Sequence, residues 1–410
     1  MVVDSNRTMM EEFETREPIE LLTHKRFDVV IKYLYASNQD SQFFETMYKE
    51  HLHRWNNFTE KNPFKRGYPQ FKKAFQDIIN NFDETPPIPV NPEGHIPNGA
   101  HRLATALYLQ QPIKVREAID EELYPIVAGY ERFYEKDLPR HMLERAAIEY
   151  AKLKSNTHVI CLFPIAHTRK WEVMDIIKKH VNVFYAASEE LNATGQLGLM
   201  KEIYFVEGWA NEAGIKRKGD QCFRGESQVT FLLIDADNLE TVKKMKTEIR
   251  ALFNVGNHSV HISDFHEDAI RISKTVFNEN SIHFLNNRKY VEFPNHTKLL
   301  ADMKPDDRKV ISGSAVLSLY GLRDCRDIDL IYDTNKPPKD SHNQYIVNFG
   351  GRGASTYYGK LTLDDIMNDP QYHLYYQGFK YASLAITKAM KERRDESKDA
   401  RDLKLIRQIQ

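Results

Sequence analysis

The chain has 410 residues, of which 41% are apolar and 28% charged, and its formal net charge is -1. At roughly 100–200 residues per domain this length predicts two to four domains, and the composition excludes global disorder. The sequence has no basic excess that would indicate a nucleic-acid partner and no apolar run of about 18 residues that would span a membrane, and its three separated cysteines predict neither disulfides nor a zinc site, so we expect a cytoplasmic protein.

The first part of the chain is predicted to be mainly helical. Residues 20 to 82 carry apolar side chains at a spacing of three to four, the period of an amphipathic helix. A proline-rich break, "DETPPIPVNPEG", follows. After it, "HIPNGAHRLATALYL" predicts a turn and a helix, and "PIKVREAI" predicts a strand.

The turn before that helix contains Gly99, His101 and Arg102 in the pattern G-x-H-R. The N-terminus of a helix beside an arginine is a typical anion site. The segment resembles the phosphate-binding turn of ParB and sulfiredoxin-like domains, and this resemblance implies that the three residues bind a nucleotide phosphate. The alternative is structural, with Arg102 pairing with a nearby carboxylate.

The central part of the chain alternates strands and helices. The predicted strands are "HVICLFPI", "NVFYAAS", "QVTFLLID" and "SVHIS". Amphipathic helices are predicted between them and after the last one, such as "KWEVMDIIKKHV" and "LETVKKMKTEIRALF". This order predicts an α+β domain in which helices cover one sheet.

The stretch "NHSVHISDFHEDAI" contains three histidines beside acidic residues. One interpretation is structural: Ser263 or Asp264 caps the following helix, and Glu267 completes a capping box. A metal site at His261 and His266 is a second interpretation, although the sequence offers no obvious third ligand.

A third interpretation comes from a resemblance. "HISDFHEDA" is similar to the active-site signature H-G-S-D-x-x-E-x-A of nucleoside diphosphate kinases, and the similarity extends over about residues 156–290. It implies a ferredoxin-like core and a nucleophilic histidine, His261, that accepts the γ-phosphate of a nucleoside triphosphate. By the same resemblance Arg169 and Arg250 hold the phosphates and Ser263 orients the histidine.

Four positions depart from that family's pattern: Phe163, His258, Ile262 and Ile272. The family has a lysine, an asparagine, a glycine and a glutamate there. These departures favour a degenerate version of the site that binds a nucleotide without reacting with it. An active phosphohistidine and this degenerate version therefore both stay open as alternatives.

The segment "ISGSAVLSLYGLRDCRDIDLIYD" carries a second motif. Gly313 and Ser314 follow a predicted strand and open an apolar helix, and Asp327 and Asp329 alternate on the next strand, so their carboxylates share a face. Two such carboxylates can hold Mg²⁺ on a triphosphate, and the Gly-Ser turn offers N–H groups to phosphates.

This spacing resembles the core of polymerase-β-type nucleotidyltransferases over about residues 308–335, and "KDARDL" further on resembles the tail of minimal members. The resemblance implies that Asp327 and Asp329 bind Mg²⁺ and that Gly313 and Ser314 bind the nucleotide. A third carboxylate is not evident, and the alternative is that both aspartates are turn residues at a strand end.

Together these segments predict an α/β and α+β multidomain protein with a ferredoxin-like central domain and a nucleotidyltransferase-like C-terminal domain. The expected domains are residues 1–150 (helical plus ParB/sulfiredoxin-like), 151–295 (nucleoside-diphosphate-kinase-like) and 296–410 (nucleotidyltransferase-like). The leading hypothesis is a phosphotransferase that uses ATP or another nucleoside triphosphate with Mg²⁺ and passes a phosphoryl group to a small acceptor, for which a sugar or glycan precursor is a guess. The alternatives are a nucleotidyltransferase using Asp327 and Asp329 and a non-catalytic nucleotide-binding regulator.

Overall fold

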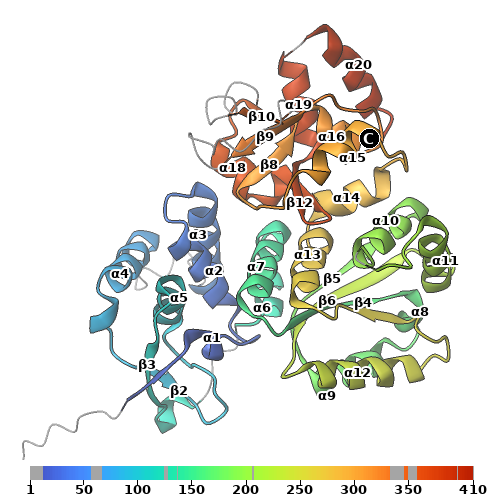
Figure 1. Ribbon diagram of the computed structural model, residues 1–410. Coiled ribbons are helices and arrows are strands. Elements are labelled where there is room, and N and C mark those ends of the chain that lie inside the picture. The colour runs from blue at the N-terminus through green and yellow to red at the C-terminus, as the bar shows by residue number, and fades with distance from the viewer. Residues whose placement is uncertain are drawn as a thin grey trace, which may run out of the picture. The chain divides into compact units, whose positions relative to one another are not determined.

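The computed structural model describes residues 13–56, 67–123, 128–135, 137–205, 207–332, 346–349, 358–394 and 396–409 (Figure 1). The chain divides into two compact units, Met1–Leu138 and Pro139–Gln410. Within the described residues the strands form three sheets, one in the first unit and two in the second, so the protein is a mixed α/β, multidomain chain.

The first unit is built on the sheet β1-β3-β2. Its strands are β1 (Glu14–Arg16), β2 (Ile88–Val90) and β3 (Ile113–Glu117), with β1 antiparallel and β2 parallel to β3. The helical pattern of residues 20 to 82 becomes α2 (Phe27–Ser37), α3 (Gln42–Asn56) and α4 (Tyr68–Asn80), and α5 (Ala100–Leu109) packs on α2. The short helices α1 (Pro18–Leu21) and α6 (Tyr130–Tyr134) complete the described part of this unit.

The second unit begins with α7 (Arg140–Leu153) and a sheet of β4 (Thr157–Leu162), β5 (Asn182–Glu190), β6 (Gln228–Asp235) and β7 (Val260–Ile262). The order is β5-β6-β4-β7, and every neighbouring pair is antiparallel. One crossover between β4 and β5 contains α8 (Pro164–His167) and α9 (Lys170–His180), and one between β6 and β7 contains α12 (Leu239–Ala251). This strand order and these crossovers are the ferredoxin-like topology, in which helices and strands alternate as the sequence predicted.

Helices cover both faces of this sheet (Figure 1). On one face α9 and α12 bury their apolar stripes against the strands, in a core that includes Ile160, Val173, Leu232 and Met245. Burying such side chains is worth about 1.5–3 kcal/mol each. On the other face α7 and α13 (His266–Val276) pack together, and α13 also packs on β4. The remaining helices of this region are α10 (Ala193–Ile203) and α11 (Glu212–Phe223).

The last sheet has the order β10-β9-β8-β12-β11. Its strands are β8 (Lys309–Ser312), β9 (Ile328–Tyr332), β10 (Ile346–Phe349), β11 (His373–Tyr376) and β12 (Phe379–Ala382). Its helices are α14 (Glu279–Asn287), α15 (Pro294–Ala301), α16 (Ser314–Leu319), α18 (Leu363–Asn368), α19 (Leu384–Arg394) and α20 (Ser397–Ile406). Because α14 packs on both α10 and β11, it connects this sheet to the ferredoxin-like region.

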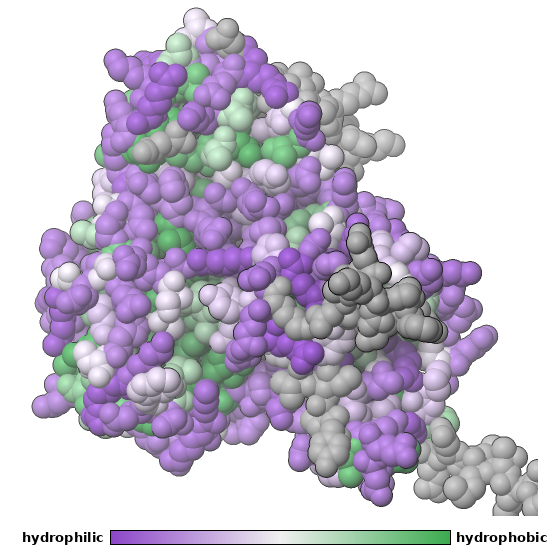
Figure 2. Space-filling view, turned by 180° about the vertical axis from the view of Figure 1, so that it is seen from behind, coloured by the Kyte–Doolittle hydropathy of each residue, from purple (hydrophilic) through white to green (hydrophobic). Residues whose placement is uncertain are grey.

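One face of the molecule is largely polar. On the face drawn in Figure 2 hydrophilic residues predominate, and the hydrophobic ones form separate small patches. Among the described helices, none combines the length and the apolar character that crossing a bilayer requires.

Candidate functional site

A cavity of about 630 Å³ opens beside the start of β9 and brings together the residues of the Gly-Ser and D-x-D motif. Gly313, Ser314, Asp327 and Asp329 all line it. Its other lining residues include six cationic side chains: Arg323, Arg326, Lys391, Arg394, Lys398 and Arg401. The two carboxylates can hold a metal ion. The cationic side chains around them can bind the phosphates that accompany such an ion.

The backbone at Gly313 allows the closest approach in this cavity. Gly313 has a φ of +65°, and a Cβ placed there would overlap the carboxylate of Asp329. Only glycine adopts this positive φ without strain and leaves room for the Asp329 carboxylate. Ser312, just before it, pairs with Asp329 across β8 and β9, so the strand register brings the turn to the carboxylate.

The two aspartates lie at the beginning of β9, with Asp327 immediately before the strand and Asp329 as its second residue. Burial, and then the negative charge of Asp327, raise the pKa of Asp329 to about 6, although Arg394 and Lys391 act in the opposite direction. A raised pKa means that the second negative charge is costly in this cavity until a cation binds.

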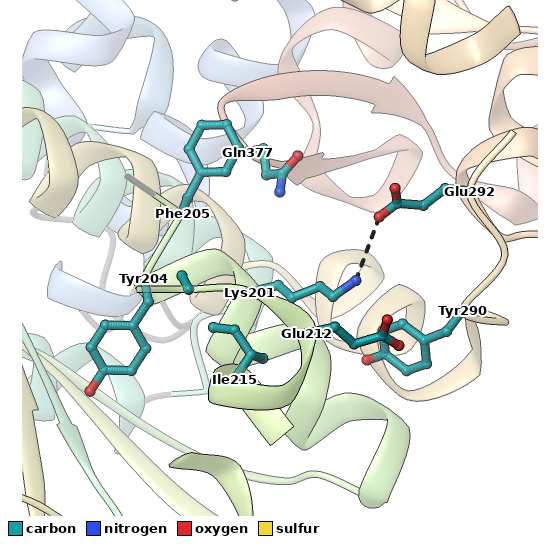
Figure 3. A pocket seen from close by; sticks show the side chains of 9 residues that line it. Lys201, Tyr204, Phe205, Glu212, Ile215, Tyr290, Glu292 and Gln377 are labelled. Atoms are coloured by element: carbon teal, nitrogen blue, oxygen red, sulfur yellow. Dashed lines mark ion pairs between the residues drawn. The ribbon is translucent and has the colours of Figure 1, made fainter. Parts of the chain in front are cut away.

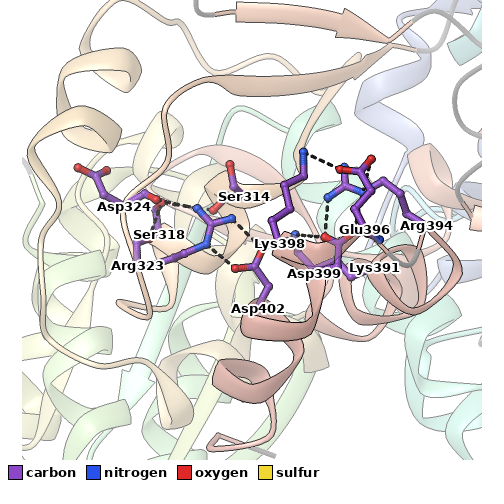
Figure 4. Close-up of polar contacts among 10 residues, drawn as sticks. All are labelled: Ser314, Ser318, Arg323, Asp324, Lys391, Arg394, Glu396, Lys398, Asp399 and Asp402. Carbon is purple, nitrogen blue, oxygen red and sulfur yellow. Dashed lines mark hydrogen bonds and ion pairs between the residues drawn. The ribbon is translucent and has the colours of Figure 1, made fainter.

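A buried ion network supports the wall of the cavity (Figure 4). Lys391 of α19 is 1% exposed and places Nζ 2.6 Å from Oδ2 of Asp402 on α20. Arg323 donates two hydrogen bonds to the same carboxylate, at 2.5 Å from Nε and 2.7 Å from Nη2. Burial alone would raise the pKa of Asp402, but Arg323 and Lys391 lower it, so Asp402 remains a carboxylate that positions both cations.

Asp399, one turn before Asp402, organises the other side of this network. It accepts hydrogen bonds from Nε and Nη2 of Arg394, at 2.8 Å and 2.6 Å. The "KDARDL" segment therefore supplies two carboxylates, three residues apart on one helix face, that hold Lys391, Arg394 and Arg323. The sequence identified this segment only by a resemblance, and it did not indicate the partner Arg323, which lies 79 residues from Asp402.

The carboxylate pair fits the chemistry of a magnesium site. Mg²⁺ is typically held by one or two carboxylates together with substrate phosphates and water. In the described part of the chain no group of three or more histidine, cysteine, aspartate or glutamate side chains could hold a metal ion. Asp333, which follows β9 in the sequence and is too close to Asp329 on the same predicted strand to be a third ligand, lies outside the described residues.

His261 lies on β7, opposite Cys161 of β4. Burial, together with the charges of Lys246, Lys218, Arg250 and Arg271, lowers the pKa of His261 to about 3. The imidazole is therefore neutral near pH 7, the form in which histidine is a nucleophile. Its Nε2 atom is buried and has no hydrogen-bond partner among the described residues.

Cations surround this imidazole, and most are fixed by backbone carbonyls. Lys218 donates to the carbonyl of Asn257 at 2.8 Å, and Lys246 donates to the carbonyl of Ile262 at 3.3 Å. Arg250 points Nη2 toward the carbonyl of Val260 at 3.5 Å, while its Nε atom is buried without a described partner. A buried nitrogen among several cations is a suitable environment for an anionic group.

Ser263 has a structural position. Its Oγ accepts a hydrogen bond from the backbone N–H of Val159 at 3.0 Å, and its carbonyl contacts Nδ1 of His158 at 2.7 Å. The helix α13 begins at His266 with Phe265 as its N-cap, without a side-chain cap. The expected cap at Ser263 or Asp264 was wrong, because hydrogen bonds between Ser263 and Val159 extend the sheet pairing past β7.

Arg169, the other expected phosphate ligand, lies on the surface. Its side chain is 40% exposed, it forms an ion pair with Glu172, and its Nη1 donates to the carbonyl of Leu252 at 2.9 Å. Its described contacts therefore connect it to the loop after α12 and not to His261, whereas Arg250 contributes to the charge around the imidazole.

The G-x-H-R turn lies in the first unit, at the start of α5. Gly99 has a φ of +97°, and a Cβ there would approach Ile88 to 2.5 Å. His101 is half-buried with its Nε2 2.8 Å from the Tyr48 hydroxyl, and desolvation of the ring holds its pKa well below the usual value. Arg102 donates to the carbonyls of Pro86 and Pro87, at 2.6 Å and 3.1 Å. These contacts fix the turn, and phosphate binding here stays a prediction.

Comparison with known proteins gives a structural likeness over part of the chain. No family model and no curated protein matches the chain. Among solved structures, the nucleoside diphosphate kinase of Aquifex aeolicus is similar over 28% of this chain and 90% of its own, with 15% sequence identity and a TM-score of 0.21. The chain thus has a structural match to that kinase over part of its length, and its ferredoxin-like topology follows from the strand order itself.

Proposed function

We propose that the protein is a magnesium-dependent nucleotidyltransferase that works in the cavity of Asp327 and Asp329. The observation that supports this most is the meeting of two carboxylates, the Gly313 turn and six cationic side chains in one cavity of about 630 Å³. That volume is in the range of pockets that hold small-molecule ligands, about 300–1,000 Å³.

The residues divide into three roles. Asp327 and Asp329 would hold Mg²⁺, which neutralises the triphosphate and the charge that develops on it. Arg326 and Arg401 have no ion-pair partner among the described residues and would contact phosphate oxygens. Gly313 gives the nucleotide close access to the backbone beside Asp329.

The reaction is a displacement at phosphorus. An acceptor hydroxyl oxygen forms a bond to the α-phosphorus, the bond from that phosphorus to the bridging oxygen breaks, and pyrophosphate leaves with the electron pair. The hydroxyl proton passes to water. The cationic wall stabilises the departing pyrophosphate, which is the main contribution that a protein makes to such a transfer.

The test is to incubate the protein with Mg²⁺, each of the four nucleoside triphosphates and a panel of hydroxyl acceptors, and to measure pyrophosphate and product mass. We expect pyrophosphate release and an added nucleoside monophosphate, both absent in Asp327→Asn and Asp329→Asn. Magnesium-dependent triphosphate binding without pyrophosphate would support the regulator instead. Absence of binding would contradict both.

A second function, phosphoryl transfer through His261, is favoured by one specific observation: the neutral imidazole has a buried Nε2 without a partner, among four cations. In that reaction Nε2 forms a bond to the γ-phosphorus and the nucleoside diphosphate leaves. The protein would be incubated with γ-labelled ATP and Mg²⁺, beside His261→Ala. Acid-labile, base-stable label that the variant lacks would support this function, and its absence in both proteins would exclude it.

A further inference from the structure

Another cavity in the second unit, Pro139–Gln410, takes part in neither proposed reaction. It has a volume of about 530 Å³ and lies between α15, the end of α16, the strands β11 and β12, and the C-terminal part of α10. An adjoining pocket shares Lys201, Phe205, Glu292 and Gln377 with it, and Lys201 and Glu292 are 3.5 Å apart at this junction (Figure 3). Neither Asp327 nor His261 lines the cavity.

Arg288 gives this cavity an unusual charge. Its side chain lies among three aromatic rings, with the guanidinium carbon 5.2 Å from the centre of Phe284, 5.0 Å from Tyr290 and 5.1 Å from Tyr376. The residue is only 8% exposed, and the Tyr376 hydroxyl is its hydrogen-bond partner. Its Nε and Nη1 atoms are buried and have no hydrogen-bond partner among the described residues.

A buried guanidinium with unused donors is costly. Each buried polar group left without a hydrogen bond costs roughly 1–3 kcal/mol, and more where the group is charged. The three rings compensate part of the charge through their faces, but they cannot accept the N–H groups in the guanidinium plane. An anionic group in the cavity would neutralise the charge of Arg288 and accept hydrogen bonds from its unpaired N–H groups.

His296 supplies a second unpaired nitrogen to the same cavity. It is 7% exposed, and its Nε2 is buried without a described partner. Burial lowers the pKa of His296 to about 4, so its ring is neutral near pH 7 and can either donate or accept a hydrogen bond. The backbone N–H of His296 donates to Asp324 at 3.2 Å, which fixes the start of α15.

The rest of the lining is mostly apolar. It includes Phe293, Leu300, Met303, Leu319 and Phe379. Pockets for small ligands typically combine such a lining with a few polar groups that orient the ligand. The occupant that fits these surroundings has an apolar body and a single anionic group.

We propose that this cavity binds a small organic anion, with its anionic group on Arg288 and His296 and its apolar body against α15 and β12. This site goes beyond the proposed nucleotidyl transfer and does not depend on it. It is a binding site separate from the Asp327 cavity, although α16 contributes Ser314 to one and Ser318 and Leu319 to the other.

Two fluorescent probes with the same apolar body test the proposal. The first, 8-anilinonaphthalene-1-sulfonate, carries an anionic group, and the second, N-phenyl-1-naphthylamine, is neutral. Each is titrated into the full-length protein and into Arg288→Met. We expect saturable binding of the sulfonate, at least about tenfold weaker binding of the neutral probe, and a similar loss for the sulfonate in Arg288→Met.

A matched pair on α15 keeps the test valid if Arg288→Met does not fold. Thr297 lines the cavity and Lys298 does not, and both are exposed. Thr297→Trp should fill the mouth and weaken sulfonate binding at least about tenfold, while Lys298→Trp should leave it unchanged. Equal binding of the two probes, no saturable binding, or equal effects of the two tryptophans would each overturn the proposal.

Discussion

The two candidate reaction sites both lie in the second unit, Pro139–Gln410, and they differ in how their reactive atoms are enclosed. His261 lies on a strand with its Nε2 buried, and its cations are held mainly by backbone carbonyls. Asp327 and Asp329 line an open cavity, and the cations near them are held by carboxylates of a separate helix. In the first site the sheet fixes the reactive atom. In the second site, charged side chains position other charged side chains. Single substitutions there should therefore be able to change activity and the free energy of unfolding independently.

The largest effect is expected from Lys391→Met in the wall of the open cavity. The change leaves Asp402 and Asp399 with fewer partners in a buried position, and breaking a buried pair typically costs 3–5 kcal/mol. Urea unfolding should show this loss in the free energy of unfolding. Lys398→Met is the control, since Lys398 is 56% exposed and among the described residues forms an ion pair only with Glu396, and it should change that free energy by no more than about 1 kcal/mol. Equal losses would contradict the network's role.

Gly313→Val should affect activity next most strongly. Its side chain would overlap the Asp329 carboxylate and strain a backbone with a φ of +65°. We expect nucleotidyl transfer, or magnesium-dependent triphosphate binding, to fall by about a hundredfold, the order of effect seen when catalytic groups are displaced. Gly208→Val is the control, because nothing lies within 4 Å of a Cβ there. A Gly313→Val protein that retains activity would show that the turn is not part of the site.

This contrast shows what the sequence could predict. Strands and helices around the ferredoxin-like sheet were predicted because apolar periodicity is a local property. Gly313, Ser314, Asp327 and Asp329 line one cavity, and the sequence brings them close because a single strand–helix–strand segment contains them. The pairing of Arg323 with Asp402, and the packing of Tyr376 on Arg288, join residues that are distant in sequence, and no local pattern predicts them.

His261 predicts an effect of pH on stability. Burial lowers the pKa of His261 to about 3, so the unfolded state binds a proton near pH 6.5 that the folded state does not bind. Stability therefore falls as the pH falls from about 6.5 toward 3, at up to about 1.4 kcal/mol per pH unit from this one group. His261→Asn should remove that part of the slope in urea unfolding series at pH 7, 6 and 5. An unchanged slope would mean that the imidazole is accessible to protons.

The smallest effect is expected at Arg169. Its comparison with Arg250 tests which arginine belongs to the His261 site. Both Arg169 and Arg250 were predicted to hold phosphate, but Arg169 is exposed and paired with Glu172, whereas Arg250 has a buried Nε without a described partner. If His261 accepts a phosphoryl group, Arg250→Gln should reduce the labelling rate by at least about tenfold, the value of one charge-assisted hydrogen bond. Arg169→Gln should leave the rate within about twofold, because its partner is already a surface carboxylate. Comparable losses in both variants would show that Arg169 leaves Glu172 when the nucleotide binds.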